Sequence, residues 1–358
     1  MGPRLARPIG SLHPGCFALV MATGIVSIAC HLAGLEPAAW VLFRVNEVAY
    51  VLLWALTLAR LVGFTPRLLA DFADPARGPG FLTMVAGTSV LGRQLVLLGG
   101  DESAGRVLGV LATLLWVVIL YGFLAAVILR AEKPEPGRWV NGAWLLAVVA
   151  TQSVPLAWMG VGRPLFEPVE QVAFLMLAFH LAGYLLYLAI ICLILLQFIG
   201  FRVEPELLTP PYWINMGAMA ITTLTGTVLV KLAPDSAVLG SVRPFLEGLT
   251  VFAWSVATWW IPLLVILFAW RHLPGRVRPR YEAQYWSMVF PLGMYSVCTY
   301  QLGQVTGVGL VQPVSQAFAY AGLLAWAAGF AGLLHSIRSQ LTASPAPWEA
   351  EVLRGLRQ

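Results

Sequence analysis

Charged side chains are scarce in this sequence. They make up only 11% of the 358 residues, whereas hydrophobic residues make up 59%. A soluble domain carries about 25% charged residues, so this chain could not cover a water-facing surface. The composition therefore excludes the soluble globular class and predicts an all-α integral membrane protein embedded in a lipid bilayer.

Motifs of catalysis, metal binding and nucleic-acid binding are missing. The sequence has no HExxH, GxSxG or Walker motif, its five histidines are scattered, and its four cysteines form no CxxC pair. No basic stripe with interleaved aromatics is present. We expect no enzyme, no catalytic residue, no metal, no cofactor and no nucleic-acid partner. The alternative is a membrane-embedded enzyme acting on a lipid or oxyanion, which would need a catalytic carboxylate or metal cluster within the spans.

Long apolar intervals predict ten membrane-spanning helices. A span needs about 20 mostly apolar residues. Seven charge-free intervals meet this requirement, and the Gly- and Pro-rich segment QLGQVTGVGLVQP divides the longest of them, residues 283–337, in two. Two further spans, roughly 43–62 and 80–98, carry a few charges. We assign residues 1–340 to one transmembrane domain and residues 341–358 to a polar cytoplasmic tail.

The positive charges predict the orientation of the chain. Sixteen Lys and Arg side chains fall in the connections on one side of the predicted spans, and six fall on the other side. The side with the excess is the cytoplasmic side. We therefore expect a multi-pass protein of the inner (plasma) membrane with both termini in the cytoplasm, which an even number of spans requires.

A short polar segment repeats in the odd-numbered spans. The segments are VMATGIVS, MVAGTSVL, VVATQSVP, AMAITTLT and VFPLGMYS. Their marker residues are 65, 64, 71 and 70 residues apart along the chain, namely Thr23, Thr88, Gln152, Thr223 and Gly293. Each interval is the length of one helical hairpin with its loops. The repeat predicts five tandem helical hairpins around a central pore.

These polar segments have two alternative roles. Small and hydroxyl-bearing residues permit close packing of membrane helices, and this is the commoner role for any single segment. Five such segments at matched depth would instead line a path across the membrane, because irregular backbone is tolerated there when it lines a cavity. The candidate pore-lining residues are Thr23, Gly24, Gly87, Thr88, Thr151, Gln152, Thr222 and Thr223.

The chemistry of the segments favours an anion. They contain hydroxyls, an amide and glycines but no carboxylate, which a cation path would normally include. Arg93 lies about one turn from the second segment, MVAGTSVL, in the third span. It either extends to the outer interface or pairs with Glu47, or it attracts anions to the outer mouth. The lone His180 in an even-numbered span is expected to pack rather than to relay protons.

Three longer motifs carry a family resemblance: HPGCFALVMATGIVS, PYWINMGAMAI and YWSMVFPLGMYSV. They resemble the tellurite-resistance/dicarboxylate transporter family, which includes fungal malate and sulfite permeases, a bacterial tellurite-resistance protein and slow-type anion channels of plants. The resemblance covers about residues 12–338. It implies a ten-helix barrel of five hairpins with a pore through the odd helices, commonly assembled as a homotrimer. The first-span Thr-Gly and the fifth-span TQ look closer to the bacterial and fungal transporters, and the long tails of the plant channels are absent.

The resemblance also implies a gate. In the channel branch of the family, a Phe before a Pro on the ninth helix closes the pore, and the matching residue here is Phe290. Pro291 is expected to bend the ninth helix and Gly293 to thin it, so that the ring enters the pore. A packing Phe beside an ordinary kink is the alternative.

The sequence thus predicts a transporter or channel for small anions. The expected substrate is a C4-dicarboxylate such as malate, or an inorganic anion. Export of sulfite or tellurite oxyanions is the alternative within transport. The residues do not distinguish a channel from a proton-coupled carrier.

Overall fold

The computed structural model describes residues 9–133, 140–273, 277 and 281–342. Of residues 340–342 it describes only the backbone. Within these ranges the chain forms helices and connecting turns and contains no β-strand, which agrees with the all-α prediction. The predicted tail, residues 341–358, coincides at its start with the end of the last helix and otherwise lies outside the described residues.

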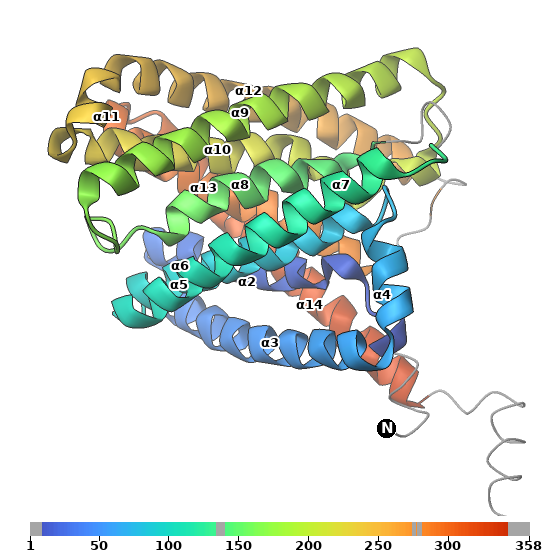
Figure 1. Cartoon of the computed structure of the whole chain (residues 1–358). Helices are drawn as coiled ribbons and strands as arrows, with labels where there is room; N and C mark the ends of the chain where they lie inside the picture. Colours follow the sequence, from blue (N-terminus) through green and yellow to red (C-terminus); the bar gives the residue numbers. More distant parts are fainter. Residues whose placement is uncertain (1–8, 134–139, 274–276, 278–280, 343–358) are drawn as a thin grey trace, which may run out of the picture.

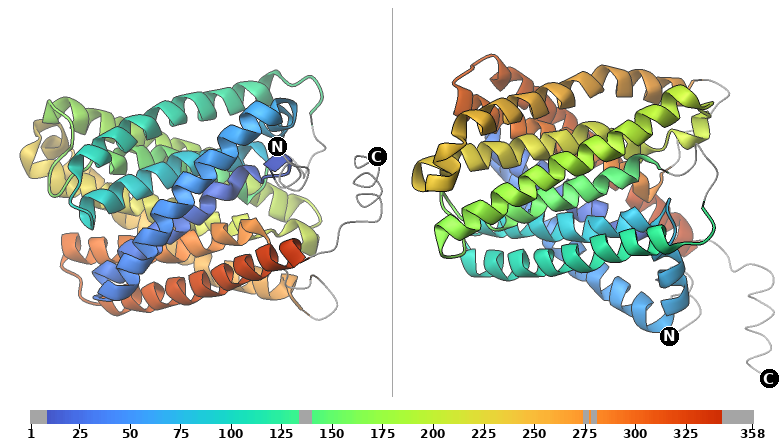
Figure 2. Two further views of the ribbon diagram at one scale, coloured as in Figure 1. Left: turned by 90° about the horizontal axis from the view of Figure 1, so that it is seen from below. Right: turned by 45° about the horizontal axis from the view of Figure 1, so that its top comes forward.

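Five helices form an inner layer. They are α2 (Ala18–Leu32), α5 (Thr83–Leu97), α8 (Leu146–Ala157), α10 (Ile214–Leu232) and α13 (Trp286–Thr306). Each packs against two others in the order α2, α5, α8, α10, α13, and α13 packs back on α2, so the inner helices form a closed ring. They occupy the interior in both Figure 1 and Figure 2.

The outer layer consists of α3 (Glu36–Gly63), α6 (Glu102–Trp116) with α7 (Gly122–Leu129), α9 (Val169–Gly200), α12 (Arg243–Arg271) and α14 (Val311–Thr342). A π-helical turn, Val117–Tyr121, joins α6 to α7 in one rod. Each outer rod packs on the inner helix that precedes it in the chain, and these contacts are made by α3, α6, α9, α12 and α14. Two short helices, α4 (Thr65–Phe72) and α11 (Ala237–Ser241), lie in connections.

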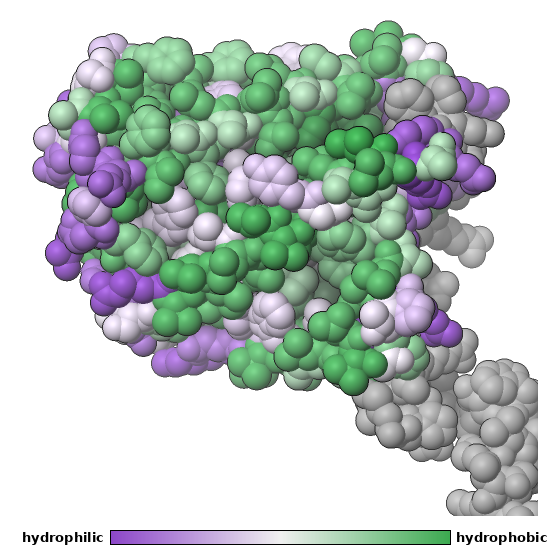
Figure 3. All heavy atoms as spheres, in the orientation of Figure 1, coloured by the Kyte–Doolittle hydropathy of each residue, from purple (hydrophilic) through white to green (hydrophobic). Residues whose placement is uncertain are grey.

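Burial separates the two layers. Between 11% and 33% of the most apolar stretch of each outer helix is buried, against 78% to 83% for the stretches that contain α2, α5 and α10. The outer helices face lipid and are apolar on all sides, as such a position requires. Figure 3 shows a hydrophobic belt between hydrophilic ends of the molecule.

Eight helices in the described part of the chain are long and apolar enough to cross a membrane. The segment Gly142–Ala157, which contains α8, is apolar but shorter than a full span, and α13 is not among the eight. Both are inner helices, which contact protein in place of lipid and can therefore carry polar residues. An integral membrane helical protein is supported, whereas ten crossings remain a prediction.

The inner helices share a feature that the sequence analysis missed. Each begins with a 3₁₀ turn that contains an aromatic residue: Pro14–Phe17, Gly78–Leu82, Gly142–Leu145, Pro210–Trp213 and Ala283–Tyr285. We call the end of the barrel where these turns lie the proximal end, and the end where the inner helices finish the distal end. The described part of the chain begins just before the first of these turns, at the proximal end, and α14 finishes at the same end (Figure 2).

Hydrogen bonds from aromatic side chains join the successive helix pairs. Each outer rod bonds the inner helix of the next pair, through Tyr50–Thr88 (3.0 Å), Trp116–Thr151 (2.9 Å), Tyr187–Asn215 carbonyl (3.3 Å), Trp254–Thr299 (2.9 Å) and Trp326–Thr23 (2.9 Å). The aromatic residues are 66, 71, 67 and 72 residues apart, so they follow the same repeat as the polar segments. The fifth bond joins α14 to α2 and closes the ring.

Removing this closing bond tests its role. Trp326→Phe keeps an aromatic side chain but removes the indole N–H, which donates a hydrogen bond to the Thr23 hydroxyl. We expect the free energy of unfolding to fall by about 1 kcal/mol, as for other hydrogen bonds between membrane helices. Detergent-based equilibrium unfolding of the purified protein measures it.

The matched control is Trp259→Phe, at a tryptophan that is 60% exposed on the outer surface. It should leave the unfolding free energy almost unchanged. Thr23→Val combined with Trp326→Phe should cost no more than either change alone. Fully additive losses would show that the bond contributes nothing.

Candidate functional site

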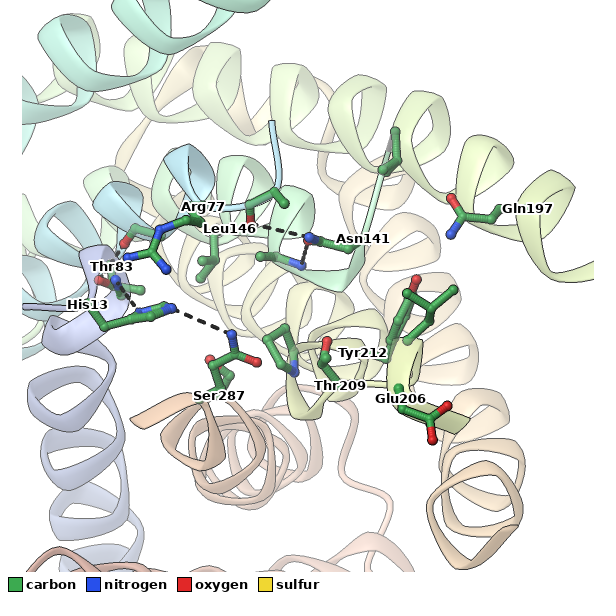
Figure 4. A pocket seen from close by; sticks show the side chains of 18 residues that line it. His13, Arg77, Thr83, Asn141, Leu146, Gln197, Glu206, Thr209, Tyr212 and Ser287 are labelled. Atoms are coloured by element: carbon green, nitrogen blue, oxygen red, sulfur yellow. Dashed lines mark hydrogen bonds between the residues drawn. The ribbon is translucent and has the colours of Figure 1, made fainter. Parts of the chain in front are cut away.

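Two cavities lie at opposite ends of the inner ring. The proximal cavity has a volume of about 360 Å³. Residues at or before the 3₁₀ turns surround it, among them His13, Arg77, Asn141 and Thr209 (Figure 4). These turns start the inner helices, so the backbone N–H groups of five helix starts are directed toward one end of the ring.

The distal cavity has a volume of about 300 Å³ and is lined by side chains from all five inner helices. One residue from each helix is Ile25, Ser89, Ser153, Ile221 and Met294. A cavity to which every inner helix contributes lies on the axis of the ring. The two cavities therefore follow one another along this axis.

Phe290 lies between the two cavities on α13. Ser287 lines the proximal cavity, and Met294, Val297 and Gln301 line the distal cavity. Residues three and four apart share one face of a helix, so Phe290 is on this same face, three residues after Ser287 and four before Met294. Its side chain is 0% exposed.

Two glycines permit close packing around this position. Pro291 lies against Gly217 of α10, where an added Cβ would be 2.7 Å from Pro291 Cγ. Gly293 lies against α2, where a Cβ would be 3.0 Å from side-chain atoms of Ile25 and Val26. Gly293 thus thins α13 on the side that packs against α2.

Three threonines that the sequence predicted to line the pore form hydrogen bonds with the outer helices. They are Thr23, Thr88 and Thr151. They accept from or share hydrogen bonds with Trp326, Tyr50 and Trp116, and all three threonines are 0% exposed. They hold the helix pairs together in this structure. Their exposure to a permeating anion stays a prediction.

The other five candidates also have specific neighbours. Thr222 and Thr223 donate to the Ala218 and Met219 carbonyls of their own helix. An added Cβ at Gly24 would be 2.8 Å from the Asn46 amide nitrogen, and one at Gly87 would be 3.4 Å from the Phe17 carbonyl. Gln152 bonds a histidine of α9, as described next. None of the eight candidates is among the residues that line the two cavities as described.

His180 of α9 packs against Gln152. The His180 Nδ1 lies 3.0 Å from the Gln152 Oε1, and the Gln152 amide nitrogen donates to the His180 carbonyl at 3.1 Å. Gly183 leaves room for this amide, because a Cβ there would be 2.2 Å from the Gln152 nitrogen. His180 lines neither cavity. This agrees with a packing role.

Ser89 and Ser153, which line the distal cavity, were missed by the sequence analysis. They directly follow the predicted residues Thr88 and Gln152. One residue is a rotation of about 100° around a helix, so these serines lie at nearly the same depth as the predicted residues but on a neighbouring face. The Ser89 hydroxyl is buried and has no hydrogen-bond partner among the described residues.

The side chains that line the distal cavity include two cationic residues, Arg93 and Lys231. Arg93 donates from one terminal nitrogen to the Met159 and Gly160 carbonyls, both at 2.8 Å. Glu47 pairs with Arg44 at 2.7 Å, so the suggested Arg93–Glu47 pair is wrong. Lys231 donates to Gln301 at 2.5 Å. No Asp or Glu is among the residues that line the cavity as described.

The proximal cavity is electrostatically balanced. Arg77 pairs with Asp71 at 2.7 Å, and Glu206 is among the lining residues. Burial, assisted by the charge of Arg77, lowers the pKa of His13 to about 4, so this imidazole is neutral at pH 7. Its Nδ1 accepts from the Gly15 N–H at 3.0 Å, which leaves the proton on Nε2 facing Gln284.

No group of three or more His, Cys, Asp or Glu side chains in the described ranges is placed to hold a metal ion.

Residues 11–334 match the family described as voltage-dependent anion channel. A transporter of Methanocaldococcus jannaschii, named as uncharacterized, is 22% identical over 309 residues, which is 85% of this chain and 88% of that protein. A sulfite efflux pump of Arthroderma otae is 21% identical over 317 residues, 83% of each chain. An uncharacterized membrane protein of Mycobacterium tuberculosis is 36% identical over 156 residues, 44% of this chain and 79% of that protein.

Thiol labelling tests which face of the inner helices meets water. In a Cys192→Ser background, which removes the exposed native thiol, Ser153→Cys should react with a small water-soluble thiol reagent. Thr151→Cys should react at least about tenfold more slowly, because a residue two positions away in a helix points to another side. Rates are followed by mass spectrometry of protein in liposomes. Faster labelling of Thr151→Cys would place the aqueous path along the threonines.

Proposed function

Because the chain belongs to the voltage-dependent anion channel family, we propose that it conducts small anions along the axis of the inner ring and that Phe290 gates this path. Anion transport is the activity of the family, and relatives are named as transporters. The observation that carries the proposal is the position of Phe290 on α13. It lies between the residues that line the proximal cavity and those that line the distal cavity.

An apolar ring is a sufficient barrier at this place. An anion that enters a narrow hydrophobic constriction loses hydration and gains little in return. Phe290 is completely buried, and Pro291 behind it packs against Gly217. Movement of α13 relative to α10 would withdraw the ring and join the two cavities. A pore lined in part by the candidate threonines in such an open state belongs to the same proposal.

The charge of the distal cavity supports an anionic substrate. Arg93 would raise the local anion concentration at the distal mouth, since its guanidinium bonds backbone carbonyls and no described carboxylate. The substrates we propose are C4-dicarboxylates such as malate, or inorganic anions. Sulfite export is the second candidate, because a relative that matches 83% of the chain is named a sulfite efflux pump.

We propose ten crossings in five hairpins, with the proximal end in the cytoplasm of a plasma-membrane protein. The count of sixteen basic side chains against six supports this orientation. The start of the first inner helix and the end of α14 lie at the same end of the barrel, which supports an even number of crossings. Homotrimeric assembly rests on the family resemblance alone.

Truncation of the proposed gate should raise conductance. Phe290→Ala removes most of the ring and should increase passive anion conductance in planar bilayers by about tenfold or more, since each ~1.4 kcal/mol of barrier removed is worth that factor. Phe290→Leu should give a smaller increase. The conductance of chloride, malate and sulfite would be compared under a fixed voltage.

The matched control is Phe123→Ala. Phe123 is also buried, but on the outer helix α7 beside Trp144, so its removal should cost about 3–5 kcal/mol of packing without opening a path. If Phe290→Ala behaves like Phe123→Ala, destabilised and no more conductive, then Phe290 is a packing residue and the gate is rejected.

The proposed orientation has a separate test. A C-terminal reporter that is active only in the cytoplasm should be active in intact cells. Ser241→Cys, in the exposed connection before α12 at the distal end, should be labelled from outside by an impermeant thiol reagent in the Cys192→Ser background. An inactive reporter together with an unlabelled cysteine would reverse the orientation.

A further inference from the structure

The distal cavity contains two cations from different inner helices, Arg93 on α5 and Lys231 on α10. Their recorded hydrogen bonds go to neutral oxygens: two backbone carbonyls for Arg93 and the Gln301 amide for Lys231. Neither takes part in an ion pair among the described residues. Two positive charges therefore face one cavity of about 300 Å³ without neutralisation by the protein.

Several arginines near helix ends pair with carboxylates, whereas Arg271, which lines neither cavity, bonds the backbone carbonyls of Pro205 and Glu206. Arg44 pairs with Glu47, Arg60 pairs with Asp71, and Arg243 pairs with Glu247. Arg93 is half-buried, whereas Lys231 is exposed. An unpaired charge that is partly dehydrated, as that of Arg93 is, costs free energy that a ligand of opposite sign recovers. What distinguishes Arg93 and Lys231 is that both line one cavity, where an anion would be stabilised.

Arg93 is oriented for such a ligand. Both of its recorded bonds come from one terminal nitrogen, which fixes the guanidinium against the turn after α8. The other terminal nitrogen and Nε have no acceptor among the described residues. This free edge of a guanidinium matches the two oxygens of a carboxylate or of a similar oxyanion.

A third polar group in the cavity also lacks a partner. The Ser89 hydroxyl lines the cavity, and the residue is only 1% exposed. No described group bonds its oxygen. A buried hydroxyl without a partner is unfavourable, and an anion held at Arg93, one turn away on α5, would accept a hydrogen bond from it.

We propose that the distal cavity is a binding site for doubly charged oxyanions, a class that includes dicarboxylates and sulfite. Arg93 and Ser89 bind one charged end or face, and Lys231 neutralises the second charge. A singly charged anion would leave one of the two cations uncompensated. This inference rests on the proposed anion transport and specifies which anions the site prefers. The cavity volume falls at the lower end of the range of small-molecule sites.

A pair of probes of nearly equal size tests the charge requirement. Succinate carries two carboxylates, and succinamate replaces one of them with an uncharged amide. We expect the purified wild-type protein to bind succinate about tenfold more tightly than succinamate in calorimetric titrations, as one additional charged hydrogen bond implies. In Lys231→Gln the two affinities should become equal within about a factor of two.

The control is Arg243→Gln. It removes a positive charge at the same end of the molecule, from a side chain that pairs with Glu247 and does not line the cavity. It should keep the preference for succinate, and a lost preference would mean that general surface charge is responsible. Melting temperatures of all variants check folding, and Lys231→Arg, which keeps the charge, should restore the preference if Lys231→Gln is unstable.

Equal binding of the two probes by the wild type, or an unchanged preference in Lys231→Gln, would overturn the inference. Chloride flux in liposomes is measured on the same preparations. Chloride flux with no preference for dianions would reject only this inference, whereas a dianion preference without flux of any anion would reject the proposed transport.

Discussion

Hydrocarbon cannot form hydrogen bonds, and this constraint sorts the chain into two layers. The outer helices present apolar side chains in every direction, and polar side chains at mid-depth are held mainly on the inner helices or directed toward them. The inner helices can then be short, as α8 is, or comparatively polar, as α13 is, because their surroundings are protein. The same constraint that would keep these two helices out of lipid thus leaves room for the proposed path at the centre of the ring.

The aromatic bonds between neighbouring pairs follow from the same constraint. A threonine hydroxyl buried at mid-depth needs partners, and a tryptophan or tyrosine on the outer helix can supply one while its ring stays apolar. Trp116, Trp254 and Trp326 use their indole N–H groups in this way. One interaction thus satisfies the polar group, fixes the angle between pairs and keeps the axis free for other residues.

The sequence was informative about depth and poor about direction. Spacing alone located the repeat and its polar midpoints, because these depend on position along the chain, and the family resemblance pointed to Phe290. It assigned Thr88 and Gln152 to the pore, whereas their neighbours Ser89 and Ser153 line the distal cavity. A helix buried on nearly all sides has no polar stripe from which its inward face can be read.

The electrostatic features were hidden for a different reason. Lys231 sits at the end of an apolar run and resembles an ordinary interfacial lysine, and only the folded ring places it in one cavity with Arg93. The suggested Glu47 partner of Arg93 pairs instead with Arg44, three residues away on the same helix. The family resemblance was reliable because its motifs extend over most of the chain, and residues 11–334 match the family.

The bond between Trp326 and Thr23 joins residues 303 positions apart, and this separation governs how the protein is made. The first inner helix emerges from the ribosome long before its partner on the last helix exists. Until α14 has been made, the ring of helix pairs is incomplete, because α2 lacks the hydrogen bond to Thr23 that Trp326 provides. Closure is therefore the final event of biogenesis, and a nascent chain released before α14 would stay open to proteolytic quality control.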